Sequence, residues 1–333
     1  MPICITCTHK IPYLYTVYES ANNLRLEQCP KCLNFADPYV EHDSLTLLLD
    51  LILLKRDVFR HLLFNRGYEP RRASKYPGPS DTNEEQRVCT MESRREKDRW
   101  KLIFQLGIVL VFVDAFIRWS HLSPSSEPGD TLSTLWTKEH VEPLLRIFAG
   151  CVIETLAFHI GITLTASAVL KAISLWQSIV KMDNPASRST VREQLRLSHI
   201  PLTLFYSSMT KLFLLLLLAL WKPSIIPSNR SFTRSTNGTE GRFFHEFLTH
   251  DVTQRALEIW DDDKLDREWV VRNVLGGMAA GFGLRVVLDI QPFFTTLIIL
   301  TGWAVKTFVA GLVSTWVNKG DSKGDVFLAY SIP

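Results

Sequence analysis

Cys4-Ile5-Thr6-Cys7 and Cys29-Pro30-Lys31-Cys32 are two matched Cys-x-x-Cys segments, and they decide how this chain begins to fold. Paired segments at this spacing are typical of a zinc ribbon, in which four thiolates hold one tetrahedral Zn²⁺. Between them, residues 11–18 and 24–28 predict two strands joined by a turn. So small a hairpin buries too little apolar surface to fold alone, and metal binding supplies on the order of 10 kcal/mol. We therefore predict one structural Zn²⁺ bound by Cys4, Cys7, Cys29 and Cys32.

Other uses of these cysteines fit less well. A redox Cys-x-x-Cys normally caps the helix of a βαβ unit, and no such unit is predicted here. Cys89 and Cys151 have no evident mates, which disfavours a secreted disulfide framework. His9 and His42 are better interpreted as surface residues, because four thiolates already fill the coordination shell of the predicted zinc ion. A filled shell leaves no open position for water, so the predicted ion is structural and not hydrolytic.

The N-terminal residues and the overall charge disfavour two further classes, proteins with a cleavable signal peptide and nucleic-acid-binding proteins. Residues 1–4 lack a basic segment followed by an apolar core, so no cleavable signal peptide is predicted and we expect a cytosolic N-terminus. The formal charge of +3 does not indicate a nucleic-acid-binding protein.

A helix is predicted after the second cysteine pair, capped by Asp43 or Ser44 and rich in leucine over 45–54. Its uncharged run is too short to cross a bilayer, which takes about 20 residues. Two interpretations stay open. The helix is amphipathic and docks on the head or lies in the membrane interface, or it is buried against the ribbon.

The same region resembles the homology domain of the Arv family. The resemblance covers about the first 65 residues and rests on the paired cysteines and on four further segments, Asn34-Phe35-Ala36-Asp37, Tyr39-Val40-Glu41, Leu53-Leu54-Lys55-Arg56 and Arg60-His61-Leu62-Leu63-Phe64-Asn65. Arv proteins are membrane proteins of the endoplasmic reticulum implicated in sterol and sphingolipid homeostasis and in glycosylphosphatidylinositol assembly. The resemblance thus implies a role in lipid homeostasis, which residue patterns alone do not show.

The remainder of the chain predicts a membrane bundle. We expect an α-helical polytopic membrane protein with a small N-terminal zinc-ribbon (β-hairpin) domain. Residues 1–65 form the head, 66–99 a polar linker that is flexible or partly helical, 100–320 the bundle and 321–333 a tail. The predicted spans are 102–119, 147–170, 202–221, 273–290 and 293–317.

The fourth predicted span, 273–290, is the least regular. It carries Arg285 and Asp289, and it either crosses the bilayer or re-enters it. Gly277 and Gly281 give it a small-xxx-small face suited to close helix packing.

Flanking charges predict the orientation. Basic residues gather before the first span and between the second and third, which places the head and residues 171–201 in the cytosol. Residues 222–271 are then lumenal, and their two sequons make Asn229 and Asn237 candidate N-glycosylation sites.

Ionisable residues inside apolar segments are the second set of candidate site residues. Each costs about 3 kcal/mol near the bilayer centre, so it should face a partner, a cavity or the interface. Asp114, Lys211, Lys306 and Asp289 can pair structurally or extend to the interface. Taken together, a polar strip suits a lipid headgroup, with these candidate residues: Glu154, His159, Lys211, Arg285 and Asp289. Glu154 with Lys211, and Arg285 with Asp289, are the expected pairs.

Three functions follow as hypotheses. The first is a non-enzymatic protein of the endoplasmic reticulum membrane, with the Golgi as a second location, that binds or moves sterol, sphingolipid or glycosylphosphatidylinositol intermediates. Its zinc head would serve as a docking module. The second is an assembly factor or scaffold for membrane enzymes of lipid biosynthesis. The third is a membrane-embedded acyl or glycosyl transferase, but the sequence has no Asp-His-His-Cys or His-Glu-x-x-His motif, phosphate loop or nucleophile elbow.

Overall fold

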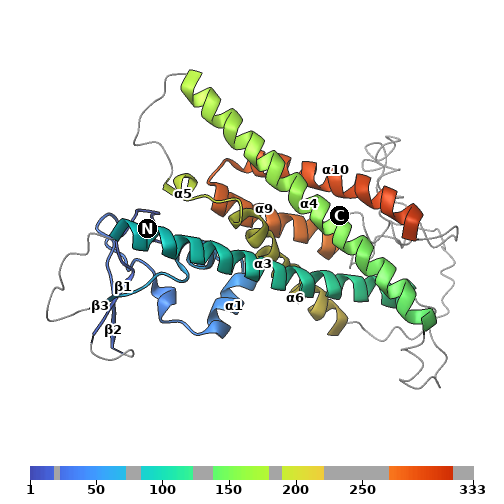
Figure 1. Ribbon diagram of the computed structural model, residues 1–333, viewed down its shortest axis with the longest axis horizontal. Helices are drawn as coiled ribbons and strands as arrows, with labels where there is room; N and C mark the ends of the chain where they lie inside the picture. The colour runs from blue at the N-terminus through green and yellow to red at the C-terminus, as the bar shows by residue number, and fades with distance from the viewer. Residues whose placement is uncertain (19–22, 73–83, 123–137, 180–189, 221–269, 318–333) are drawn as a thin grey trace, which may run out of the picture.

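The chain forms a small sheet at one end of a bundle of long helices (Figure 1). The computed structural model describes residues 1–18, 23–72, 84–122, 138–179, 190–220 and 270–317. The predicted fold class is confirmed, because these residues are mostly helical and an antiparallel hairpin lies beside the four clustered cysteines.

The hairpin consists of β1 (Tyr15–Val17) and β2 (Leu24–Leu26), paired so that Tyr15 faces Leu26. A third strand, β3 (Arg71–Arg72), pairs parallel with β1 and gives the order β2-β1-β3. The sequence did not predict β3, because a strand of two residues has no alternation to detect. It places the first part of the predicted linker on the head.

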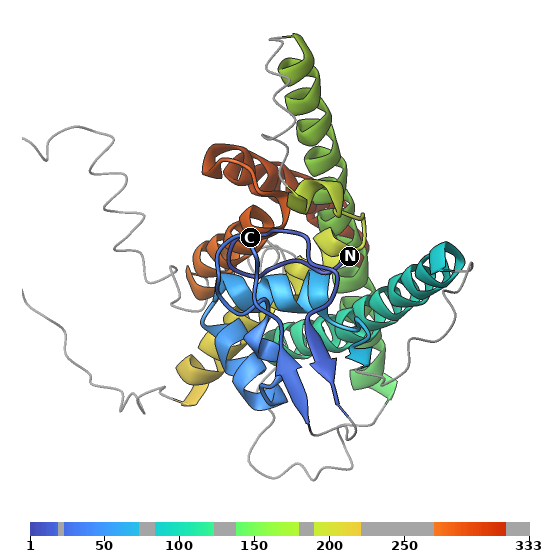
Figure 2. The same ribbon diagram turned by 90° about the vertical axis from the view of Figure 1, so that its left-hand side faces the viewer.

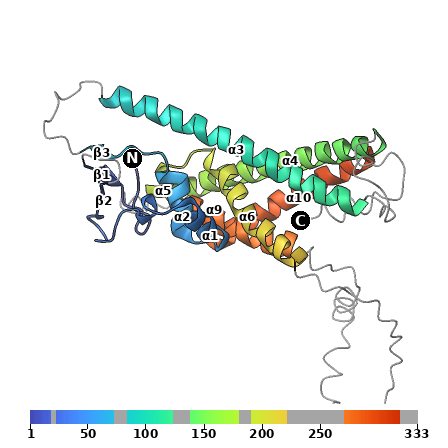
Figure 3. The same cartoon turned by 90° about the horizontal axis from the view of Figure 1, so that it is seen from below.

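Among the described residues, four helices are long and apolar enough to cross a membrane: α3 (Glu84–Leu122), α4 (Lys138–Ile179), α6 (His199–Leu220) and α10 (Pro292–Val317). α3 begins well before the predicted span, so residues 84–99 of the predicted linker are helical and continuous with it. α10 lies along α4, and α3 also packs on α4 (Figures 1 and 3).

The predicted fourth span is shorter than the others. It consists of the π-helix η5 (Val271–Leu275) and α9 (Gly276–Leu288), an apolar stretch below the length of a spanning helix. α9 packs mainly on α6 and ends where Asp289 adopts a left-handed conformation with φ of 47°. Pro292 then starts α10, so the two helices form the expected tight hairpin.

The glycines of α9 differ in what they contact. A Cβ added to Gly277 would collide with Cζ2 of Trp303 on α10, whereas a Cβ on Gly281 would meet nothing within 4 Å. Close packing on the predicted small-residue face therefore involves Gly277 and not Gly281.

The last part of the head, which follows the cysteines, packs on the bundle. It comprises the 3₁₀-helix η1 (Pro38–Val40), α1 (Ser44–Ile52), α2 (Arg56–Arg60) and the π-helix η2 (His61–Asn65). α1 contacts α6, and α2 contacts α9. One apolar cluster includes Ile3 of the head, Phe59 of α2 and Leu202 of α6. Seen from its sheet end, the head lies directly against the bundle (Figure 2).

Candidate functional site

The two cysteine pairs form matching turns. In each, the first cysteine accepts a hydrogen bond from the N–H four residues later, from Thr8 to Cys4 at 2.9 Å and from Leu33 to Cys29 at 2.9 Å. Thr8 and Leu33 both have φ near 60°, at 63° and 61°, a conformation that few side chains favour. Each turn is closed by a backbone bridge at equivalent positions, Ile3 with Lys10 and Gln28 with Phe35.

The sulfur geometry fits one tetrahedral metal ion. Sγ of Cys4 lies 3.7 Å from Sγ of Cys32, Sγ of Cys7 lies 3.4 Å from that of Cys29, and all four ligand atoms lie within 4.8 Å of one another. Four sulfurs at about 2.3 Å from Zn²⁺ are separated by about 3.8 Å, whereas a disulfide needs about 2.05 Å. The observed spacing therefore matches a thiolate cage and not a pair of disulfides.

Burial keeps the thiols of Cys4 and Cys7 protonated, whereas at Cys29 backbone hydrogen bonds outweigh burial. Hydrogen bonds from the backbone N–H groups of Cys32 and Lys31 lower the pKa of Cys29 to about 7. Burial raises the pKa of Cys4 and raises the pKa of Cys7 to about 12. A divalent cation must displace these protons when it binds, so metal affinity depends on pH. When bound, Zn²⁺ would cross-link the two turns through the thiolates and supply folding free energy.

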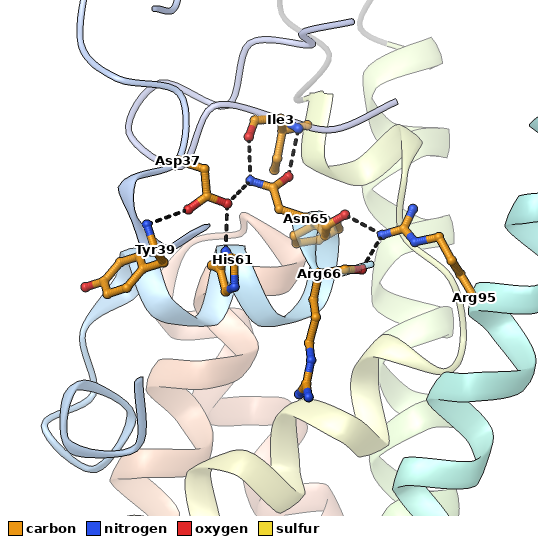
Figure 4. A network of polar contacts seen from close by, with 8 residues as sticks. Ile3, Asp37, Tyr39, His61, Asn65, Arg66 and Arg95 are labelled. Carbon is orange, nitrogen blue, oxygen red and sulfur yellow. Dashed lines mark hydrogen bonds and ion pairs between the residues drawn. The ribbon is translucent and has the colours of Figure 1, made fainter. Parts of the chain in front are cut away.

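Behind the cysteines, a buried polar network ties the first turn, and the segment that follows the second turn, to η2 (Figure 4). The carboxylate of Asp37, which is fully buried, accepts hydrogen bonds from the backbone N–H of Tyr39 at 3.1 Å and from Nδ2 of Asn65 at 2.7 Å. Nδ1 of His61 lies 2.7 Å from the same carboxylate and donates to it, because an ionised carboxylate only accepts.

Asn65 extends this network to the first cysteine turn. Its side chain accepts from the N–H of Ile3 at 2.9 Å and donates to the C=O of Ile3 at 2.8 Å. Arg60 donates from Nη1 to the carbonyl of Ile5 at 2.6 Å and to that of Thr6 at 3.0 Å. From the bundle, Arg95 on α3 donates to the carbonyls of Phe64 and Arg66 (Figure 4). Asp37, Arg60, His61 and Asn65 thus form a hydrogen-bond network, here called the polar lock, that fixes the cysteine cluster on the helices.

A second buried polar cluster lies inside the bundle. Nη1 of Arg118 on α3 lies 3.0 Å from Oε2 of Glu154 on α4, and Nη2 lies 2.8 Å from Oδ2 of Asp114 one turn earlier. Arg118 and Glu154 are almost fully buried, with exposed fractions of 2% and 1%. Arg118 and Asp114 line a cavity of about 150 Å³, whose wall also includes Lys211 of α6 and Lys306 of α10.

An apolar groove of about 520 Å³ lies beside this cavity, between α3, α4 and α6. The two spaces share Val111, Thr155 and Phe205 as a common wall. His159 also lines the groove. Its Nδ1 bonds the carbonyl of Thr155 at 2.8 Å, while its Nε2 is buried without a hydrogen-bond partner.

The structure brings three of the five predicted polar residues together. Lys211 lines the charged cavity, Glu154 pairs with Arg118 on the wall of that cavity, and His159 lines the adjoining groove. Arg285 and Asp289 are exposed and belong to neither lining. Asp289 instead lies near α5 (Thr190–Glu193), where Nη2 of Arg192 donates to its carbonyl at 2.8 Å. Asn229 and Asn237, and the tail 321–333, lie outside the described residues.

Arg118 belongs to the charged cluster inside the bundle, although it was not among the residues predicted from the sequence. Its spacing of four residues from Asp114 on one helix was a usable signal for an ion pair. That Arg118 also reaches Glu154 on another helix could not be read from the sequence, because the rotation of α3 relative to α4 depends on packing.

Comparison with known proteins agrees with the resemblance of the head. The profile of the Arv1-like family matches residues 3–235. Protein ARV1 of Saccharomyces cerevisiae is 49% identical over 63 residues, which are 19% of this chain and 19% of that protein. Protein ARV 1 of Arabidopsis thaliana is 23% identical over 215 residues, 65% of this chain and 66% of its own. Protein ARV1 of Homo sapiens is 26% identical over 162 residues, 48% and 46% of the two chains.

These matches differ in extent. In its alignment with the yeast relative, the chain covers 19% of that protein's length. In its alignment with the human relative, it covers 46% of that protein's length. No solved structure matches the chain.

Proposed function

Since this chain belongs to the Arv1-like family, we propose that it is a non-enzymatic mediator of sterol and lipid homeostasis that binds or moves lipid within its helical bundle. The observation that carries this proposal is the groove between α3, α4 and α6. Its 520 Å³ are lined almost wholly by apolar side chains, as expected of a site for a lipid hydrocarbon.

The position of the groove supports a lipid as its occupant. All three helices are long and apolar enough to cross a membrane. Groove residues such as Phe104 and Leu164 are 69% and 65% exposed, which in a bilayer brings them into contact with acyl chains. A lipid can therefore enter sideways from the membrane without crossing water.

The head is proposed to face the cytosol as a zinc-stabilised docking module. Arg95 and Arg99 on the first part of α3 lie against it, and such basic clusters mark cytosolic flanks. Membership in the family and the resemblance of the head together favour the endoplasmic reticulum membrane, with the Golgi membrane as a second location.

A closed thiolate shell supports a non-enzymatic role for the metal, because it leaves no coordination position for water or substrate. Within the bundle, Asp114 and Glu154 are held in an ion-pair cluster around Arg118. They do not form a nucleophile with an adjacent base.

Lipid binding and transfer by the purified full chain test this proposal. Protein in liposomes should exchange fluorescent lipid between vesicles without forming any new lipid product. Val152→Trp, which fills the groove from α4, should reduce transfer at least fivefold. Ile153→Trp is the matched control, since Ile153 is the exposed neighbour on α4 outside the groove lining, and it should leave transfer unchanged. Equal transfer by both variants, or product formation, would contradict the proposal.

A second candidate, an assembly factor for lipid-synthesising membrane enzymes, is favoured by the outer face of α1. Leu45, Leu48 and Leu49 expose 61%, 45% and 50% of their surface. Such a face can lie in the membrane interface or contact another protein. Co-purification of a defined enzyme that is lost on Leu45→Glu, with no lipid transfer by the pure protein, would favour this role instead.

A further inference from the structure

The charges of the bundle cavity do not balance. Arg118 is shared by Asp114 and Glu154, and these three side chains together carry one negative charge. Lys211 and Lys306 on the cavity wall add two positive charges, so the five groups sum to +1. Within the part of the chain that the structure describes, no hydrogen bond or ion pair involves Lys306. An uncompensated charge at membrane depth is costly, so the cavity should attract an anion.

The cavity wall holds Lys211 by close packing against α9. A Cβ on Gly276 would lie 3.1 Å from Cδ of Lys211, so the glycine lets the lysine stem lie against α9. Asn273 and Ser208 add neutral polar groups to the same wall. The volume of about 150 Å³ is ten times the roughly 15 Å³ that one water requires, which leaves room for a small polar group.

The apolar groove lies directly next to this cavity, because Val111, Thr155 and Phe205 line both. One space is positively charged and the other is apolar. Together they match an amphipathic molecule that has a negatively charged end and a hydrocarbon end.

We propose that the bundle selects a lipid whose headgroup carries an anionic phosphate, with the phosphate beside Lys306 and Lys211 and the hydrocarbon in the groove. This inference rests on the proposed lipid-handling function and narrows the class of lipid. A phosphodiester supplies the one negative charge that the five side chains lack, and lysine is a common phosphate ligand. The hydroxyl of a sterol is uncharged and would leave the cavity unbalanced.

Competition for the purified full chain in detergent tests the inference. The probes are phosphatidylinositol, a fluorescent sterol and inorganic phosphate. Wild-type protein should bind phosphatidylinositol at least tenfold more tightly than Lys306→Met does, and Lys306→Arg should recover most of the affinity. Arg285→Met is the matched control, because Arg285 is an exposed basic residue of α9 outside both linings, and it should bind as wild type does. Zinc content and elution volume show that each variant is folded.

The outcomes separate this inference from the proposed function. Equal binding of phosphatidylinositol by wild type and Lys306→Met would overturn the phosphate site. Sterol binding that is lost in Val152→Trp, without phospholipid binding, would overturn it too but would leave the lipid-handling function standing. Binding of inorganic phosphate alone would show an anion site that takes no lipid, and binding of no probe would overturn both.

Discussion

The protein contains two buried polar clusters, and they differ in how completely their groups satisfy one another. In the head, the buried carboxylate of Asp37 bonds to both His61 and Asn65, and Asn65 also bonds to the backbone of Ile3. In the bundle, the cluster around Arg118 adjoins a cavity and carries an excess positive charge. A cluster that is complete stabilises one conformation, whereas a cluster that lacks a charge and has space can bind a ligand.

Removal of zinc should produce the largest difference in stability between the head and the bundle. Cys29→Ser, or chelation, should abolish metal binding and unfold the head, because the ion supplies on the order of 10 kcal/mol. The helices of the bundle should persist, since lipid leaves their backbone no other partners. Metal analysis and limited proteolysis in nanodiscs measure the two effects. Cys151→Ser should keep one zinc per chain, as Cys151 is buried in the bundle far from the cage.

Acid should have the same effect as chelation. Because burial raises the pKa of Cys4 and Cys7, binding of zinc releases protons, and its stabilisation is present at neutral pH and lost as the pH falls. Zinc release followed with a chromogenic chelator should therefore speed up on acidification. A rate that does not change with pH would contradict a thiolate site.

The head cluster can be broken without touching the cysteines. Asp37→Ala leaves the buried donors of Tyr39, His61 and Asn65 without an acceptor and should lower the free energy of unfolding of the head by about 4 kcal/mol. Urea unfolding followed by zinc release measures this. Asp43→Ala, which removes an exposed helix cap, should have a much smaller effect. Equal losses in the two variants would show that the network is not a lock.

The ion-pair cluster of the bundle should be destabilised when Arg118 is removed, and part of that loss should be reversible by removing a second charge. Arg118→Met takes the shared guanidinium from Asp114 and Glu154 and should destabilise the bundle by about 3 kcal/mol, measured as thermal unfolding in detergent. Adding Glu154→Gln should recover part of the loss, because one fewer charge is buried. Arg146→Met, which breaks an exposed pair with Glu142, is the control and should change stability little. No recovery in the double variant would contradict the ion-pair account.

The smallest expected difference lies between two glycines of α9. Gly277→Ala should cost about 2 kcal/mol, because its Cβ would collide with Trp303 on the cavity wall. Gly281→Ala should be neutral or stabilise by up to about 1 kcal/mol, since open space surrounds it. Equal stability of the two variants in detergent would show that Trp303 moves freely and that the wall is not rigid.

Some of these features could be predicted from local sequence. The cysteine spacing predicted the cysteine cluster and the hairpin, because four thiolates meet at one point only if two turns are joined by a short hairpin. Apolar length predicted the helices that the structure shows as α3, α4, α6 and α10. The length of α9 and the pairing of β3 with β1 were not predictable, because their neighbours are distant in sequence.

The sequence by itself therefore determined the cluster of four cysteines and the long apolar helices, because both depend on residues close together in the chain. Only the tertiary structure decided that Arg118 joins Asp114 to Glu154, that the head packs on the bundle, and that Arg285 and Asp289 lie away from the cavity. These outcomes depend on how each helix is rotated and where it crosses the next. Packing of whole helix surfaces sets both quantities, and no local pattern of residues specifies them.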